Sequence, residues 1–235
     1  MHKVYKFAST LTMSVVFALI LTSDVKADNF SFIGNFTQDD NVQLFSFTVG
    51  ASSNVTLRTW SYAGGVNAQG QTIARGGFDP ILALFDSTGA RIGQNDDGGG
   101  NVPADINGIR FDTFLQVGNL TAGTYTVSVM QFNNFAPSNL NTGTFSRAGQ
   151  GNFTAAFDPR CTQGQFVDVS TFTFPNNCRD SHWAFDVLGV NAAVIVNPTP
   201  TAVPEPATML LLGTGLAGIA AKVRRRRKAN KSEDV

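Results

Sequence analysis

Short runs in which apolar and polar residues alternate are the feature that most limits the folds open to this chain of 235 residues. Residues 29–36, 42–49 and 55–62 alternate in this way. A period of two places the apolar side chains on one face of a β-strand. Gly, Asn, Ser and Asp separate the runs, as in tight turns. Between the terminal segments no helical apolar period exceeds two turns, so the sequence predicts an all-β fold.

Many short strands with Gly- and Asn-rich turns favour an antiparallel β-sandwich. The alternating phenylalanines are expected to form most of its core. Residues 80–86 and 90–94 are separated by Ser87-Thr88-Gly89, which predicts a hairpin. The expected strands cover residues 29–36, 42–49, 55–62, 80–86, 90–94, 111–117, 123–132, 151–157, 167–174 and 183–190.

The first residues have the pattern of a secretory signal peptide. Lys3 and Lys6 precede an apolar stretch at 7–22, and a small residue, Ala27, closes the segment. This order predicts a signal helix in residues 1–27 with cleavage after Ala27. Residues 28–196 are then the expected extracellular sandwich domain.

The last residues place a proline-bounded motif, an apolar run and a cationic block in direct succession. Pro204 and Pro206 hold Glu205 in extended, accessible backbone. Residues 207–223 form a short apolar run. In lipid, such a run can hydrogen-bond its own backbone N–H and C=O groups only as a helix. The basic residues 224–235 are expected to stay cytoplasmic, leaving everything upstream outside. Residues 197–206 are the expected linker, 207–223 the transmembrane helix and 224–235 the tail.

This order of elements resembles the PEP-CTERM sorting signal of exported proteins from Gram-negative bacteria. The resemblance implies that an exosortase, a membrane transpeptidase-like enzyme, recognises Pro204, Glu205 and Pro206 and removes the tail. It also implies an inner-membrane precursor, and a product at the cell surface or outside the cell, in bacteria that secrete exopolysaccharide. An ordinary C-terminal anchor is the alternative, and it too leaves the body of the protein outside.

The region between the two ends carries an unusual set of charges. Its basic residues are seven arginines and its acidic residues thirteen aspartates, which gives a net charge of −6. A lysine-free acidic surface argues against nucleic acid as a partner. Cys161 and Cys178 would lie in an oxidising compartment, which predicts a disulfide. Free thiols or metal ligands are the alternative for this pair.

Several aspartates fall where strands are expected to end. In the hairpin of 80–86 and 90–94, Asp79 and the loop with Asp96 and Asp97 lie at the same end. Gathered carboxylates repel one another unless a cation neutralises them, and Ca²⁺ prefers such oxygens. The candidate Ca²⁺ ligands are Asp39, Asp40, Asp79, Asp96 and Asp97. Turn formation explains the same residues without any metal, and both interpretations remain open.

The motifs of residues 30–132 resemble a bacterial pre-peptidase C-terminal-like β-sandwich, a jelly-roll type of fold. They include 34–42, 76–80 with Gly-Gly-Phe-Asp-Pro, 84–89, 95–98 with Asn-Asp-Asp-Gly, and 120–127. Residues 135–202, which hold both cysteines, depart from that pattern, so the resemblance assigns them no role.

Catalytic chemistry has few candidates. A serine triad would need His182 as its base, and both cysteines are expected to be bonded to each other. We therefore expect no catalytic residues and a non-enzymatic surface or matrix protein associated with exopolysaccharide or an envelope glycan. The alternatives are a carbohydrate-binding module, in which Trp60, Tyr62 or Trp183 stacks on sugar rings, and an unrecognised hydrolase.

Overall fold

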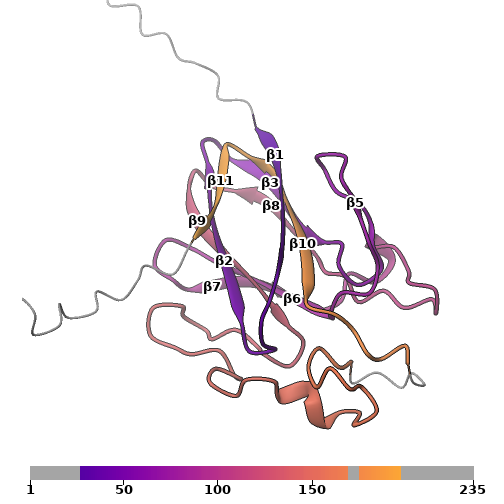
Figure 1. Cartoon of the computed structure of the whole chain (residues 1–235). Helices are drawn as coiled ribbons and strands as arrows, with labels where there is room; N and C mark the ends of the chain where they lie inside the picture. Colours follow the sequence, from indigo (N-terminus) through magenta and orange to yellow (C-terminus); the bar gives the residue numbers. More distant parts are fainter. Residues whose placement is uncertain (1–26, 169–174, 197–235) are drawn as a thin grey trace, which may run out of the picture.

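A computed structural model describes residues 27–168 and 175–196 (Figure 1). Two antiparallel sheets face each other across a common core. The first has the order β1-β10-β3-β8, and the second the order β11-β2-β9-β6-β7. The expected all-β antiparallel sandwich is therefore confirmed, while the predicted signal helix (1–27, of which only Ala27 is described) and transmembrane helix (207–223) lie outside the described residues.

Eight of the ten expected strands are confirmed, with boundaries shifted by a few residues. The elements in chain order are β1 Asp28–Asn35, β2 Val42–Val49, β3 Ser53–Thr59, β4 Gly65–Val66, β5 Thr72–Ile73, β6 Pro80–Phe85, β7 Arg91–Asn95, η1 Gly99–Asn101, β8 Phe114–Leu120, β9 Gly123–Gln131, η2 Phe153–Ala156, β10 His182–Val190 and β11 Ala192–Val196. The short strands β4 and β5 pair with each other in a third, two-stranded sheet.

The alternating residues form the core that their pattern predicts. Phe45 and Phe47 of β2 and Phe185 of β10 are almost fully buried between the two sheets. The ring centroids of Phe45 and Phe185 lie 4.9 Å apart. Apolar area removed from water stabilises a fold by about 25 cal/mol per Å². Inter-sheet phenylalanine packing is therefore the main contribution of these strands to stability.

Strand β6 is buried along its whole length, which alternation alone does not predict. Leu82 and Leu84 face the inter-sheet core, whereas Ile81, Ala83 and Phe85 belong to a second apolar cluster. Phe132, Phe135, Leu140 and Phe145 pack against this second cluster. The segment after β9 thus covers the outer face of the larger sheet.

One sequence expectation about the C-terminal half is wrong. Residues 151–157 contain no strand, and Phe153–Ala156 form the 3-10 helix η2. Of the strand expected at 167–174, only Val167 and Asp168 are described, and Val167 makes an isolated bridge to Cys178. The edge strand β11 was not expected, because its run of small and apolar residues does not alternate. It pairs with β2 from Ala192↔Thr48 to Val196↔Leu44.

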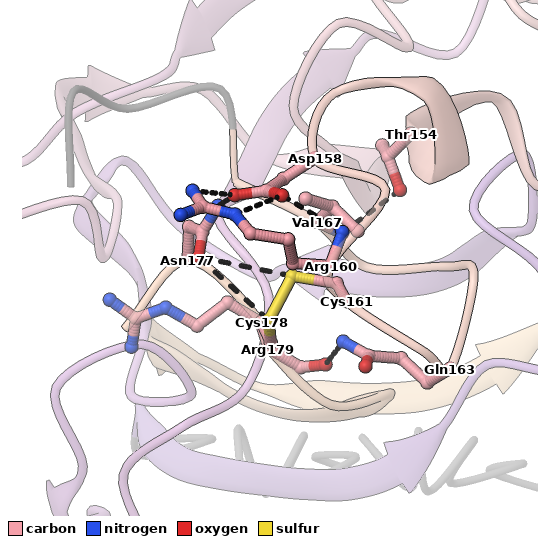
Figure 2. Close-up of a disulfide and its surroundings, with 9 residues drawn as sticks. All are labelled: Thr154, Asp158, Arg160, Cys161, Gln163, Val167, Asn177, Cys178 and Arg179. Atoms are coloured by element: carbon pink, nitrogen blue, oxygen red, sulfur yellow. Dashed lines mark hydrogen bonds and ion pairs between the residues drawn. A yellow bond between two sulfur atoms is a disulfide. The ribbon is translucent and has the colours of Figure 1, made fainter. Parts of the chain in front are cut away.

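The disulfide between Cys161 and Cys178 is present, as predicted (Figure 2). Its Cα atoms lie 5.3 Å apart. Beside it, the side-chain amide of Asn177 donates to Asp158, and Arg160 pairs with the same carboxylate. The hydrogen bond from the Arg160 side chain is the main reason why the pKa of Asp158 is lowered. The covalent link closes the loop that lies between η2 and β10.

Candidate functional site

One end of the sandwich gathers carboxylates from segments that are far apart in the sequence. The pairing of β6 with β7 sets Leu82 opposite Asn95. Asp79, just before β6, and Asp96 and Asp97, just after β7, therefore lie at the same end of one hairpin. Each of the latter two charges raises the pKa of Asp79, as does Asp168. The hairpin geometry expected from the sequence is thus found.

Asp79 has the most unusual environment of the group. Only 4% of the residue is exposed, and its Oδ1 has no hydrogen-bond partner among residues 27–168 and 175–196. Burial is the main cause of a pKa well above its usual value, and the neighbouring carboxylates add to it. A buried polar atom without a partner costs free energy, so such atoms are rare in folded proteins.

Asp96 and Asp97 lie on a glycine-containing loop. Burial, and then the charge of Asp97, raises the pKa of Asp96 to about 6. Its Oδ1, like that of Asp79, is buried and has no partner in the part of the chain that the structure describes. Gly98 anchors the loop, since its amide donates to the Asp112 carbonyl at 2.8 Å. A Cβ at this position would come within 2.5 Å of Val102 Cγ1, so the close approach requires glycine.

Asp168 and Tyr62 join this group, and sequence reasoning missed both in this role. The Tyr62 hydroxyl, which is fully buried, donates to Asp168 Oδ2 at 2.7 Å. Tyr62 is available because β3 ends at Thr59 instead of continuing to residue 62 as expected. The Arg179 guanidinium lies 3.6 Å from the centroid of the Tyr62 ring and donates to Asp105 at 3.0 Å.

The disulfide-linked loop positions Asp168. The Asp168 amide donates to the Asn177 carbonyl at 2.8 Å, and the Val167 amide donates to Thr154 Oγ1 at 2.9 Å, as Figure 2 shows for the Val167 bond. Arg179 directly follows Cys178. The part of the chain to which the resemblance assigned no role therefore supplies one carboxylate of the group and a cation beside it.

Asp112 also lies near this end, but both of its carboxylate oxygens already accept hydrogen bonds within the protein. Its side chain accepts hydrogen bonds from the Tyr62 and Ala63 amides, at 3.1 and 2.9 Å, and from the Thr59 hydroxyl at 2.9 Å. Burial raises its pKa in spite of these bonds. Because its oxygens are already bonded, Asp112 acts as a structural carboxylate that holds the turn after β3.

Asp39 and Asp40 do not join Asp79, Asp96 and Asp97. Asp39 accepts hydrogen bonds from the Thr154 amide at 2.8 Å, from the Thr154 hydroxyl, and from the Phe166 amide at 2.7 Å. Asp40 accepts one from the Gly151 amide at 3.0 Å. The five aspartates proposed from the sequence thus divide into two groups, and these two connect the β1–β2 turn to the η2 loop.

Within residues 27–168 and 175–196, no three His, Cys, Asp or Glu side chains are close enough, as placed, to share one metal ion. The oxygens of Asp79 and Asp96 that find no hydrogen-bond partner among these residues are nevertheless hard carboxyl oxygens buried in the protein. The residues therefore fit an oxygen-liganded cation in chemistry, and the open loop after Asp97 would have to close around it.

His182 is engaged at both ring nitrogens. Nδ1 contacts the Asp180 carboxylate, and Nε2 lies 3.0 Å from the Ala74 carbonyl. Because a carbonyl oxygen only accepts, Nε2 must carry the proton there. The neighbouring Ser181 hydroxyl donates to Asn35, at 3.3 Å. Neither side chain is arranged as the nucleophile and base of a serine triad.

Pro204, Glu205 and Pro206 lie outside the described residues. In the described parts of the chain, no helix is both long and apolar enough to cross a membrane.

Comparison with known proteins bears on the C-terminal segment. A family model described as the PEP-CTERM protein-sorting motif matches residues 202–227. No curated protein matches the chain significantly. This motif marks an exported protein whose membrane-anchored precursor is processed by an exosortase. The likeness of residues 30–132 to pre-peptidase C-terminal-like domains stays a prediction.

Proposed function

We propose that this protein is a non-enzymatic component of the cell surface or extracellular matrix, sorted by an exosortase and associated with secreted polysaccharide. The sorting motif is the observation that carries the proposal. The last described strand, β11, ends at Val196, and the motif begins at residue 202. Processing within the motif would therefore release or transfer the sandwich with every described strand retained.

The side chains that could perform catalysis support a non-enzymatic role. Both cysteines form the disulfide, and His182 is held between a carboxylate and a carbonyl oxygen.

The aromatic residues that could stack on sugar rings are used in packing. Tyr62 and Trp183 are buried. The Trp60 ring carries the Arg58 guanidinium 3.7 Å from its centroid, and its Nε1 donates to Asp186 at 2.7 Å. A stacking platform is therefore not displayed by these three residues, which favours a structural matrix component over a carbohydrate-binding module with a defined ligand.

The sorting step is tested in the native host with the double substitution Pro204→Ala and Glu205→Ala. We expect the variant to accumulate in the membrane fraction with its tail attached, while the wild type loses the tail and reaches the outer surface or the matrix. Pro198→Ala, which lies in the linker outside the motif, is the matched control and should behave as wild type. Equal processing of all three proteins would overturn the proposal.

Association with polysaccharide needs its own experiment. We expect the mature protein to sediment with the secreted polysaccharide and to be released when a glycosidase degrades it. A protein that stays in the supernatant would contradict the matrix role. A saturable hit on a glycan array would instead support the binding-module alternative.

A further inference from the structure

We propose that the end of the sandwich where the β6–β7 hairpin meets Asp168 is a Ca²⁺ site, with Asp79 and Asp96 as its central ligands and Asp97 and Asp168 completing it. This set differs from the five aspartates that the sequence suggested. The site does not depend on how the C-terminal tail is processed, so it can fail or hold independently of the sorting proposal.

The unpartnered oxygens carry the argument. Asp79 is 4% exposed, and its Oδ1 accepts no hydrogen bond from any described residue. The Oδ1 of Asp96 is also buried and likewise finds no donor in the described parts of the chain. Asp79 precedes β6 and Asp96 follows β7, and the pairing of Leu82 with Asn95 places both residues at the open end of the hairpin. Two orphaned carboxylate oxygens at one place indicate that a positively charged partner belongs there.

A proton is the competing partner. A buried carboxyl group can remain neutral, and burial favours that form of Asp79. One proton, however, satisfies only one carboxyl group, whereas Asp97 and Asp168 add further charge beside it. A divalent cation neutralises several carboxylates at once and gives each orphaned oxygen a ligand bond.

The oxygen ligands select the type of ion. Ca²⁺ takes six to eight oxygens in flexible geometry, while Mg²⁺ demands a near-ideal octahedron. Zinc prefers nitrogen and sulfur. The described cysteines are bonded to each other, and His182 is held by Asp180 and Ala74, so neither supplies such a ligand. A carboxylate group with the Tyr62 hydroxyl nearby therefore fits Ca²⁺ best.

Binding requires the loop after β7 to close. As placed, no three carboxylates are at common ligand distance. Asp97 is exposed, and a Cβ on Gly99 or Gly100 would contact nothing within 4 Å, so this side of the loop is open. Gly98 stays anchored on Asp112. We infer that the ion draws Asp96 and Asp97 toward Asp79 while the anchor holds.

The experiment compares the EDTA-treated full chain with and without Ca²⁺ by calorimetry at neutral pH. At a Ca²⁺ concentration of about 100 times Kd, the Tm should rise by roughly 5–10 °C. D79N and D96N should each lose this rise. D40N removes the same charge from the β1–β2 turn and should keep it.

A second measurement guards against variants that fail to fold. Tb³⁺ replaces Ca²⁺ at oxygen sites and emits when a nearby aromatic ring is excited. The wild type should show this emission through Tyr62, and Ca²⁺ should abolish it by competition. D96N, whose side chain is partly exposed, should lack the emission while keeping the wild-type circular dichroism spectrum.

The proposal is overturned by an unchanged wild-type Tm and absent Tb³⁺ emission, since Asp79 would then be a neutral acid. It is equally overturned if D79N and D96N, correctly folded, respond to Ca²⁺ as the wild type does.

Discussion

Two pairs of aspartates in this protein have similar sequence surroundings and opposite structural roles. Asp39 and Asp40 follow β1 and meet a loop whose backbone amides bond to their oxygens. Asp79 and Asp96 flank the β6–β7 hairpin, and each leaves a buried oxygen without a partner. The first pair completes the fold by itself. The second pair finds no partner for these oxygens within residues 27–168 and 175–196, and the proposed Ca²⁺ site would supply one.

Among substitutions at these aspartates, replacing Asp39 should reduce the free energy of unfolding most. Asp39→Ala leaves the buried amides of Thr154 and Phe166 without acceptors. We expect a loss of about 3–5 kcal/mol in the free energy of unfolding, because each buried unpaired group costs about 1–3 kcal/mol. Urea denaturation measures it. In EDTA, Asp79→Ala should cost less, because Asp79 Oδ1 accepts no hydrogen bond from a described residue. If it lowers the free energy of unfolding as much as Asp39→Ala does, the two aspartates do not differ in structural role.

Removing the disulfide should affect both pairs, because the loop it closes carries Phe166 and Asp168. For Cys161→Ser with Cys178→Ser we expect a loss of about 3 kcal/mol, the value for a loop of this length. The Ca²⁺-dependent rise in Tm should shrink as well, since Asp168 is positioned by Asn177. If stability falls but the response to Ca²⁺ is undiminished, Asp168 is not part of the site.

Gly98 tests whether the loop with Asp96 and Asp97 is anchored. In Gly98→Ala the new Cβ would lie 2.7 Å from the Asp112 carbonyl oxygen and closer still to Val102. Overpacking of this kind costs about 1–3 kcal/mol. Gly100→Ala meets no atom within 4 Å and is the matched control. Thermal unfolding of the two variants should differ, and equal stability would show that the anchor is dispensable.

Asp96 should make stability without Ca²⁺ depend on pH. Its pKa is raised from 3.8 to about 6. A raised pKa means that the folded state keeps the proton longer, so the stability linked to it is complete below about pH 3.8 and is lost as the pH rises through 6. In EDTA at pH 7, the free energy of unfolding of Asp96→Asn should therefore be about 1–2 kcal/mol higher than that of the wild type. This value allows for solvent screening of the partly exposed carboxylate. Near pH 3.5 the two proteins should be equally stable.

The measurement is the free energy of unfolding at several pH values in EDTA. Added Ca²⁺ should reverse the order at pH 7, making the wild type the more stable protein. If the difference in the free energy of unfolding between Asp96→Asn and the wild type is the same at every pH, Asp96 does not cause the pH dependence of stability.

Alternation and turn residues were enough to predict the sandwich and eight of its strands. They also predicted that Asp79, Asp96 and Asp97 share one end, because a hairpin is a local structure. Strand β11 was missed since Ala192 to Val196 does not alternate. The segment that forms η2 was expected to be a strand, although Phe153 and Phe157 are four residues apart, a spacing that also fits a helical turn.

The rest of the site depends on contacts between distant segments. Asp39 was grouped with the candidate ligands because its partners, Thr154 and Phe166, lie 115 and 127 residues away in the sequence. Asp168 was missed because only the disulfide-linked loop brings it to Tyr62, 106 residues distant. The cysteines were identified from the sequence, but the residues that their bond would position were not.

The sorting motif makes the sandwich the exported product of a membrane-anchored precursor. Intact-mass spectrometry of the protein recovered from the native cell surface or medium is the sharpest test. We expect a mature chain that begins near Asp28 and ends within or near Pro204 to Pro206. A protein that retains both Met1 and Val235 and is found in the cytosol would contradict it.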